Sequence, residues 1–496
     1  MEHQEPQEQQ VFVLVNKYRR FSEAVQQLIM SSAEHTATTY SISSLGFLPE
    51  FCCTRIRDTN PMSYINKLAE YLNEYESKAG DTIIDYVNSL PSYDPALHDV
   101  ETLTEGEMRY AYAILTMGMN RYVWARGVKD AASRSHIPSI IAVPLHNICS
   151  ILGITMSLTH ASVDLWNWRL KDKSQPFGLD NIESLYTMTG AYDESWFYLI
   201  MVAIEGICGQ ILYLLPAFHK LVSMKEYNPA LEILTDLNTC IHEASNIIRR
   251  MSEHCDPSFF FNRLRIYLSG SKNNNLPNGL TFDLDGVEQT IRYDGGSAAQ
   301  STLIQVFDEF LGVEHNGYEG TYLKSMHQYM PADHRNYLAM IKSLGTVQNA
   351  INTIQNQELR NVFNQTYESC LRNLGSFRTG HLKLVDDYIM VFVRQMQAEQ
   401  AEQAEPTNPS EPTNPSEPAK TSGNAHGAKG SGGTDPMDFC TNIIKDTRNQ
   451  AKTIKTEQAS PFFDQLDLTN LPLGMKIYVY SLVFMVISIM WMVWRG

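Results

Sequence analysis

One histidine of the sequence stands inside an apolar helical pattern, in the stretch "SFRTGHLKLV" (376–385). On a helix of 3.6 residues per turn, His381 shares a face with Leu374, Phe377 and Leu384. A buried imidazole needs a hydrogen-bond partner or a metal, because leaving it unpaired costs roughly 1–3 kcal/mol. Two interpretations follow from this stretch alone: a core histidine bonded to a carbonyl group, or an axial ligand to a haem iron.

Three consecutive phenylalanines precede an arginine in the segment "HCDPSFFFNRLRIYLSG" (254–270). Phe261 and Arg265 are four residues apart, so they share a face if the segment is helical, and Phe260 lies close by. Aromatic rings beside a guanidinium suit an amphipathic ligand that has an aromatic body and a carboxylate head. The alternative is a core segment with a structural salt bridge.

Two runs of small residues could approach a ligand closely. The run "YDGGSAAQS" (293–301) permits contact with a flat ligand and supplies the hydroxyl of Ser297, or it is an ordinary loop before a helix. The run "GSGGTD" (430–435) is not a phosphate loop, because no G-K-[ST] follows it, and we interpret it as a flap or the end of a linker. No nucleophile–base signature stands out, so an enzyme of this sequence would depend on a cofactor.

The elements that must position these residues are predominantly helical. Between Met62 and Met396, apolar residues recur at three- and four-residue spacing, and the pattern breaks at Gly, Pro or Asn. Strand-like alternation is scarce, and the segment 279–295 is the expected hairpin or loop excursion. A further helix is expected over 435–454, where the chain returns after a linker. The predicted class is all-α.

Charge and cysteine content exclude several classes of protein. The formal net charge of −16 and the lack of a basic patch argue against a nucleic-acid partner, which needs a basic face. The eight cysteines form no C-x-x-C pair, which suits neither a zinc site nor a disulfide framework and favours a reducing compartment. The acidic N-terminus lacks the basic and apolar regions of a secretory signal.

The C-terminal end predicts a membrane anchor. Residues 477–494 carry no charge, lie between Lys476 and Arg495, and would span roughly 27 Å as a helix. The alternative is a buried C-terminal helix. We predict a single-pass tail anchor in the endoplasmic reticulum or the mitochondrial outer membrane, with the preceding chain in the cytosol.

These patterns predict seven regions. They are an N-terminal extension (1–39), a small helical domain (40–152), a large helical domain (153–396), a Pro/Glu-rich linker (397–429), a flap and returning helix (430–455), a juxtamembrane linker (456–475) and the anchor (476–495). The boundary between the two helical domains is placed near Pro144 and "LGITMSL". The linker contains a tandem "EPTNPS" and few apolar residues, so it cannot offset its own ordering entropy.

Five short runs of the sequence together resemble one known family. "RIYLSG", "GGSAAQS", "YMPADHRNYL", "SFRTGHL" and "GSGGTD" occur in this order and spacing in indoleamine 2,3-dioxygenases, and the resemblance covers roughly residues 40–455 without the linker. It implies a two-domain helical fold that holds haem b. It further implies that L-tryptophan and O2 react to give N-formylkynurenine, the first step of the kynurenine pathway, with an external reductant.

The resemblance also assigns residues by position. The implied catalytic residues are Arg265, which clamps the substrate carboxylate, Phe260 against the indole, and Ser297. The implied haem-binding residues are His381 as the proximal iron ligand, Arg378 and Asp308 as an ion pair behind it, and Gly296 and Ala298 in a bordering loop. The implied substrate pocket adds Phe197, Phe261, Ser431, Met201 and His160.

Two of these positions depart from the family pattern. Met201 stands where the family often has a distal serine, and His160 stands where a tyrosine often lines the pocket. A bulky thioether could narrow the O2 side, and an imidazole adds a titratable donor near the pocket. The alternative function is therefore a haem protein that senses or carries O2, NO or haem with little turnover of tryptophan, although retention of Arg265 argues against it.

Overall fold

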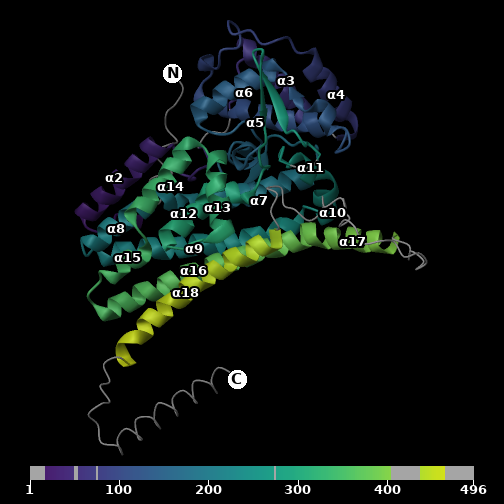
Figure 1. Ribbon diagram of the computed structural model, residues 1–496. Helices are drawn as coiled ribbons and strands as arrows, with labels where there is room; N and C mark the ends of the chain where they lie inside the picture. Colours follow the sequence, from purple (N-terminus) through teal and green to yellow (C-terminus); the bar gives the residue numbers. More distant parts are fainter. Residues whose placement is uncertain (1–16, 50–53, 74–75, 273–274, 404–435, 464–496) are drawn as a thin grey trace, which may run out of the picture. The chain divides into compact units, whose positions relative to one another are not determined.

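Helices dominate the part of the chain that the computed structural model describes, residues 17–49, 54–73, 76–272, 275–403 and 436–463 (Figure 1). The prediction of a mostly helical protein is confirmed, with two small sheets added. The chain divides into two compact units, Met1–Arg448 and Asn449–Gly496, and the described part of the second is the end of α18 (Pro436–Phe463). Ser431, most of the predicted linker and the predicted anchor lie outside the described residues.

A first group of helices surrounds α5 (Glu105–Trp124), whose side chains are buried along most of its length. Thr104 and Glu107 form a capping box that fixes where this helix begins. Three helices pack near it, namely α3 (Tyr64–Leu72), α4 (Glu76–Ser89) and α6 (Ser139–Leu152). Because α5 has apolar residues on every side, it is the centre of this group.

A three-stranded sheet lies against α6 and confirms the hairpin predicted within 279–295. Its strands are β1 (His136–Ile137), β4 (Leu280–Leu284) and β5 (Val287–Ile291), with β1 parallel to β4 and β4 antiparallel to β5. Asp285 and Gly286 form the turn with φ of 57° and 83°, the geometry of a tight hairpin. A second antiparallel pair joins β2 (Trp168–Leu170) to β3 (Ile182–Ser184).

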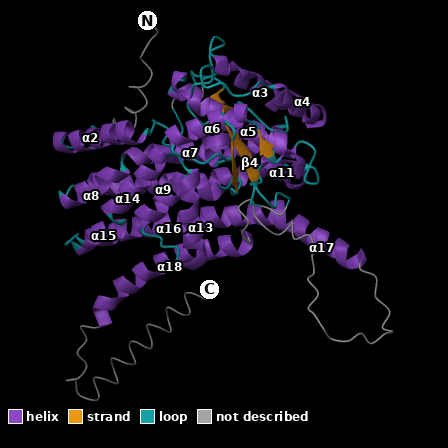
Figure 2. Ribbon diagram, turned by 45° about the horizontal axis from the view of Figure 1, so that its top comes forward, coloured by secondary structure: helices purple, strands orange, loops and turns teal. Residues whose placement is uncertain are grey.

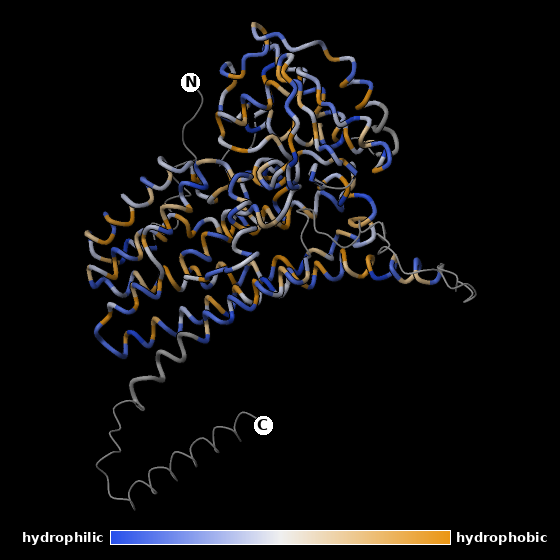
Figure 3. The backbone as a smooth tube through the Cα atoms, in the orientation of Figure 1, coloured by the Kyte–Doolittle hydropathy of each residue, from blue (hydrophilic) through white to orange (hydrophobic). Residues whose placement is uncertain are grey.

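A second group of helices is built around α9 (Tyr227–Ile248) and α16 (Gln357–Val385), which lie side by side (Figures 1 and 2). Hydrophobic and hydrophilic residues alternate within the turns of these helices, so each buries one stripe (Figure 3). The neighbouring helices are α7 (Tyr192–Gly209), α8 (Leu215–Ser223), α12 (Thr302–Leu311), α13 (Gly317–Met326), α14 (Ala332–Leu344) and α15 (Val347–Asn352). This group carries His381 in the last turns of α16.

The predicted N-terminal extension contains a packed helix, α2 (Glu23–Tyr40). Its buried side chains include Val25, Ile29 and Ala33, and it packs against α8 and α14. Ser22 caps its start by accepting from the backbone N–H of Val25. The residues that precede the family resemblance are therefore partly built into the helical core.

Pro144, which was expected near a domain boundary, lies inside α6 and is buried. The helix continues to Leu152 and ends at Gly153, whose φ is +61°. A Cβ at Gly153 would also lie 2.6 Å from the Cβ of Ala332, so both its backbone and its packing favour glycine. The helix end is therefore fixed by Gly153, nine residues after the proline.

One stretch of the described residues, Tyr192–Ser223, is long and apolar enough to cross a membrane. Its most apolar window is 83% buried inside the protein, as expected of a core helix. This stretch comprises α7 and α8, and α7 packs against α9. Its apolar composition is thus accounted for by the helical core.

Candidate active site

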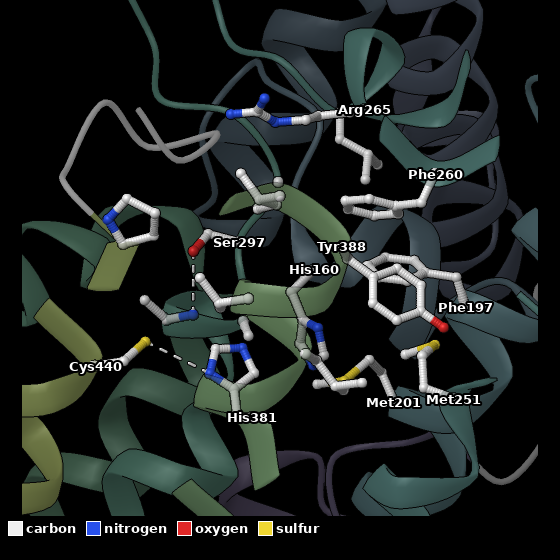
Figure 4. A pocket seen from close by; sticks show the side chains of 18 of the residues that line it. His160, Phe197, Met201, Met251, Phe260, Arg265, Ser297, His381, Tyr388 and Cys440 are labelled. Atoms are coloured by element: carbon white, nitrogen blue, oxygen red, sulfur yellow. Dashed lines mark hydrogen bonds between the residues drawn. The ribbon is translucent and has the colours of Figure 1, made fainter. Parts of the chain in front are cut away.

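A cavity of about 210 Å³ lies where several predicted site residues meet (Figure 4). Its lining includes His160, Phe197, Met201, Phe260, Arg265, Gly296, Ser297, Ala298 and His381. A smaller cavity of about 100 Å³ shares His381 and Met201 with it and is also lined by Asp308 and Arg378. The structure therefore brings together residues that are more than 200 positions apart in the sequence.

Three π-helical turns contribute to the walls of the larger cavity. They are η4 (Ala161–Leu165), η8 (Phe260–Leu264) and η11 (Asp386–Met390), the π turns of the described chain. A π turn inserts an extra residue into a helix, is rare, and is frequent at functional sites. A π turn rotates the side chains that follow it. A period of 3.6 residues per turn therefore does not predict which of these side chains face the cavity.

Phe261 shows this effect. Phe260 lines the cavity and lies 5.0 Å from Phe197 and 5.7 Å from Tyr388 between ring centroids. Phe261 stacks instead on Phe392 at 4.9 Å, and it is not among the described residues that line the cavity. The structure therefore does not place Phe261 at the cavity where its substrate contact was expected. The Cζ atom of Arg265 lies 5.3 Å from the centre of the Phe261 ring, in agreement with the predicted shared face.

His381 faces the cavity with a neutral imidazole. Burial, followed by the nearby charge of Arg378, lowers the pKa of His381. Its Nδ1 lies 3.7 Å from the Sγ of Cys440 on α18 (Figure 4). Burial raises the pKa of this cysteine to about 11, so it remains a thiol at neutral pH. No pattern in the sequence indicates the contact of Cys440 with His381, because this contact depends on where the returning helix packs.

An ion-pair network holds the helix that carries His381. Both carboxylate oxygens of Asp308 accept from Nη2 of Arg378, at 2.7 and 2.6 Å, and Arg378 also donates to Thr447. His315 lies between two carboxylates, with Nε2 3.2 Å from Asp308 and Nδ1 3.0 Å from Asp446. Burial alone would raise the pKa of Asp308, but Arg378 and His315 outweigh it and hold that pKa low. We call Asp308, Arg378, His315 and Asp446 the proximal cluster.

A second buried charge cluster lies beside the same cavity. His160 Nδ1 is 2.6 Å from Oδ2 of Asp164, and its Nε2 is 2.9 Å from Oε1 of Glu205. The hydroxyl of Ser301 donates to that same Glu205 oxygen at 2.6 Å. Burial would lower the pKa of His160, but Asp164 and Glu205 outweigh it and raise the pKa to about 10. We call these four residues the distal cluster.

The distal cluster changes the expectation for His160. Both of its ring nitrogens already have carboxylate partners, so it does not offer the free titratable donor that was expected near the pocket. Asp164, which lines the cavity, and Glu205 were missed from the sequence. A signal was available for Asp164, because a histidine and an acid four residues apart share a helix face in "HASVD".

The small-residue run forms a wall of the cavity through close backbone packing. A Cβ on Gly295 would lie 2.2 Å from the carbonyl oxygen of Leu268, and one on Gly270 would lie 2.3 Å from the amide nitrogen of Gly295. The two motifs "RIYLSG" and "GGSAAQS" therefore need glycine where they touch. Ser297 Oγ accepts from the N–H of Ala299 at 3.2 Å and so fixes the turn that follows.

Arg265 occupies another part of the lining. Burial lowers the pKa of its guanidinium, although an arginine remains charged at neutral pH. In the close view Arg265 and His160 lie well apart, and Phe260 and Phe197 lie to one side of both (Figure 4). The cavity therefore combines a cation, aromatic walls and a neutral imidazole, which suits an aromatic carboxylate beside a metal-bearing group.

Comparison with known proteins finds one family. The pattern described as "Indoleamine 2,3-dioxygenase" matches residues 36–453. "Indoleamine 2,3-dioxygenase 1" of Rattus norvegicus is 32% identical over 301 residues, which cover 60% of this chain and 72% of the relative. "Indoleamine 2,3-dioxygenase nanC" of Aspergillus nanangensis is 30% identical over 380 residues, covering 73% and 89%. "6-hydroxytryptophan 2,3-dioxygenase fscD" of Fusarium equiseti is 29% identical over 375 residues, covering 73% and 86%.

Proposed function

Because the chain belongs to the indoleamine 2,3-dioxygenase family, we propose that it is a haem-dependent dioxygenase of tryptophan. The reaction inserts both atoms of O2 across the indole C2–C3 bond of L-tryptophan and gives N-formylkynurenine. The observation that carries the proposal is one cavity in which a neutral imidazole, two phenylalanine rings and a guanidinium converge. One relative is named for 6-hydroxytryptophan, so the substrate is proposed at the level of tryptophan and its ring-substituted forms.

The donor set of the cavity fits a haem group. His381 is neutral, its Nδ1 has Cys440 as a partner, and no hydrogen bond of its Nε2 is found among the described residues. A neutral imidazole nitrogen in apolar surroundings is a common proximal ligand of haem iron. We assign His381 as that ligand, Arg378 and Asp308 as the pair that holds its helix, and Gly296 and Ala298 as the edge of the haem site. When bound, the haem supplies the iron that takes up O2.

The remaining tasks belong to the protein. Arg265 pairs with the carboxylate of the amino acid, and this charge-assisted contact fixes one end of the substrate. Phe197 and Phe260 hold the indole by ring packing, and their apolar surfaces exclude water. Met201 adds to the apolar wall, and Ser297 shapes the loop at the haem edge. Orientation of the indole accounts for much of the rate, since a positioned substrate needs no further entropy loss to react.

The proposal is tested with the full chain loaded with haem, a chemical reductant and L-tryptophan. His381→Ala is expected to lose both the haem absorption band and the product. Arg265→Ala is expected to raise KM about 10- to 100-fold, the loss of one charge-assisted hydrogen bond. Arg263→Ala, which removes an exposed cation two residues before Arg265, is the matched control and is expected to keep KM unchanged. A haem band that depends on His381 without any product would instead support a sensor or carrier.

We further propose that residues 477–494 anchor the chain in a membrane, with the enzyme on the cytosolic side and reduced by an external donor. The support is the run of 18 uncharged residues between Lys476 and Arg495. The full chain is expected in the membrane fraction after alkaline extraction. Val486→Arg, which places a charge at the middle of the segment, is expected to move it to the soluble fraction. Recovery of the unaltered chain as soluble protein would contradict the anchor.

A further inference from the structure

Two hydroxyl groups meet at the wall of the larger cavity. Tyr322, on α13, lines this cavity together with Ser297, and the two side chains are hydrogen-bonded to each other. The ring of Tyr322 is held by Phe439 of α18, 5.2 Å away between ring centroids, and by Tyr318, which stacks on it at 6.3 Å. The hydroxyl of Tyr322 is therefore fixed beside the small-residue loop. We call Tyr322 and Ser297 the hydroxyl pair.

The hydroxyl pair has one more donor than it uses. Two hydroxyl groups carry two protons, and the hydrogen bond between them uses one. Burial, followed by the charge of Asp294, raises the pKa of Tyr322 to about 12, so its hydroxyl keeps its proton at neutral pH. The Oγ of Ser297 already accepts from the N–H of Ala299 at 3.2 Å. No acceptor for the second proton is found among the described residues, so this proton is available to a ligand.

The other strong hydrogen-bond donors of the described lining are already engaged. Both ring nitrogens of His160 have carboxylate partners, and the hydroxyl of Tyr388 donates to the carbonyl oxygen of Cys255 at 2.7 Å. Arg265 is assigned to the carboxylate of the amino acid, and His381 to the iron. A further acidic group that enters this cavity would therefore meet the hydroxyl pair.

A haem group brings acidic groups of this kind, because it carries two propionate carboxylates on one edge of its ring. Ser297 stands between Gly296 and Ala298, the two residues assigned to the edge of the haem site. A carboxylate that leaves water must find donors or a cation, since burying it unpaired is costly. Hydrogen bonds from hydroxyl groups to a carboxylate are short and strong. The position of the hydroxyl pair and its spare proton thus suit the acidic edge of the cofactor.

We propose that the hydroxyl pair is a carboxylate-binding subsite that takes one propionate of the haem, with Tyr322 as a further haem-binding residue. This inference rests on the haem binding of the proposed function and specifies what holds the acidic edge of the cofactor. Each O–H group rotates about its C–O bond, so both hydroxyls can turn toward an incoming carboxylate. The pair then exchanges the one hydrogen bond that it shares for two that are charge-assisted.

The test compares haem with haem dimethyl ester, in which both carboxylates are blocked. The full chain is loaded with either pigment, and transfer of the pigment to an excess of apomyoglobin is followed by absorption. Tyr322→Phe, which removes one oxygen atom and keeps the ring, is expected to lose haem about tenfold faster than the unaltered chain, the effect of one charge-assisted hydrogen bond. Both chains are expected to lose the ester at the same rate. Tyr388→Phe, which removes a tyrosine hydroxyl from the same lining, is the matched control and is expected to change the two rates by the same factor.

The outcomes separate this inference from the function on which it rests. An equal change for haem and its ester in Tyr322→Phe, or no change for either, would overturn the subsite and leave haem binding intact. Weaker binding of L-tryptophan in calorimetry, with an unchanged loss of haem, would assign the pair to the substrate carboxylate and also overturn the subsite. Failure of the unaltered chain to hold haem would overturn both proposals. If Tyr322→Phe does not fold, Ser297→Ala removes the other hydroxyl, and the same selective loss of haem over its ester is expected.

Discussion

Two buried clusters beside the candidate active site share one motif, a histidine between two carboxylates, and differ in how completely it is paired. In the proximal cluster, Arg378 adds a second cation, and both oxygens of Asp308 have partners. In the distal cluster no arginine is present among Asp164, Glu205, His160 and Ser301, and one oxygen of each carboxyl group is left over. A fully paired buried network adds stability, whereas each buried polar atom without a partner costs free energy.

This difference in pairing accompanies a difference in which elements each cluster joins. The proximal cluster joins α12, α16 and the start of α18, so it fixes the helix that carries His381 against the returning segment. The distal cluster joins the π turn η4 to α7, on the wall that holds Phe197 and Met201. The proximal cluster therefore holds the helix that carries His381, and the distal cluster holds two elements of the cavity wall together.

The largest expected effect comes from matched isosteric changes in the two clusters. Asp308→Asn leaves Arg378 buried without its ionic partner, which is expected to cost about 3–5 kcal/mol of unfolding free energy. Asp164→Asn is expected to cost clearly less, because burial already raises the pKa of Asp164 and one of its oxygens is unpaired. Denaturant unfolding of the haem-loaded chain measures both variants. Equal losses would show that the two clusters are equivalent and break the comparison.

A second expected effect is a loss of stability at alkaline pH. The pKa of His160 is raised from 6.5 to about 10, so its ion pairs contribute fully below pH 6.5 and lose that contribution as the pH rises toward 10. His160→Phe should therefore have a flatter profile of melting temperature over this range than the unaltered chain. Asp308, whose pKa is lowered, acts in the opposite direction, since its contribution is lost only in acid. An unchanged alkaline slope in His160→Phe would contradict the assignment.

A smaller effect is expected from the thiol beside His381. A serine hydroxyl is a better hydrogen-bond acceptor than a thiol, so Cys440→Ser should strengthen the contact with Nδ1 and make the imidazole more electron-donating. The expected result is a more negative reduction potential of the bound haem. Cys370→Ser, a buried change on α16 away from the ring, is the control and should leave the potential unchanged. A shift of the same size in both variants would assign the effect to helix packing.

The smallest effect is expected at an exposed ion pair on the same helix. Lys383 and Asp387 form an i,i+4 pair at 2.7 Å on the outer face of the segment that carries His381. Because Lys383 is exposed, Lys383→Ala should leave the melting temperature and haem content unchanged. A loss comparable to that of Asp308→Asn would show that stability near His381 depends on surface charge rather than on the proximal cluster.

Much of the fold followed from local patterns. Apolar periodicity predicted the helices, an Asp-Gly turn lies in the predicted hairpin, and the helix expected over 435–454 is found as the start of α18. The packing of α2 and the continuous helix through Pro144 did not follow, because both depend on contacts with distant segments. Periodicity reports which face of an element is apolar, and it is silent on which partner covers that face.

The sequence by itself determined the chemistry available: one histidine in an apolar pattern, an arginine one turn from phenylalanines, and glycines where two loops touch. Only the tertiary structure decided that Phe260 faces the cavity while Phe261 stacks elsewhere, that Cys440 meets His381, and that Asp164 and Glu205 enclose His160. The physical reason is that residue types and spacing act along one element, whereas π turns and the packing of helices set which side chains share a space.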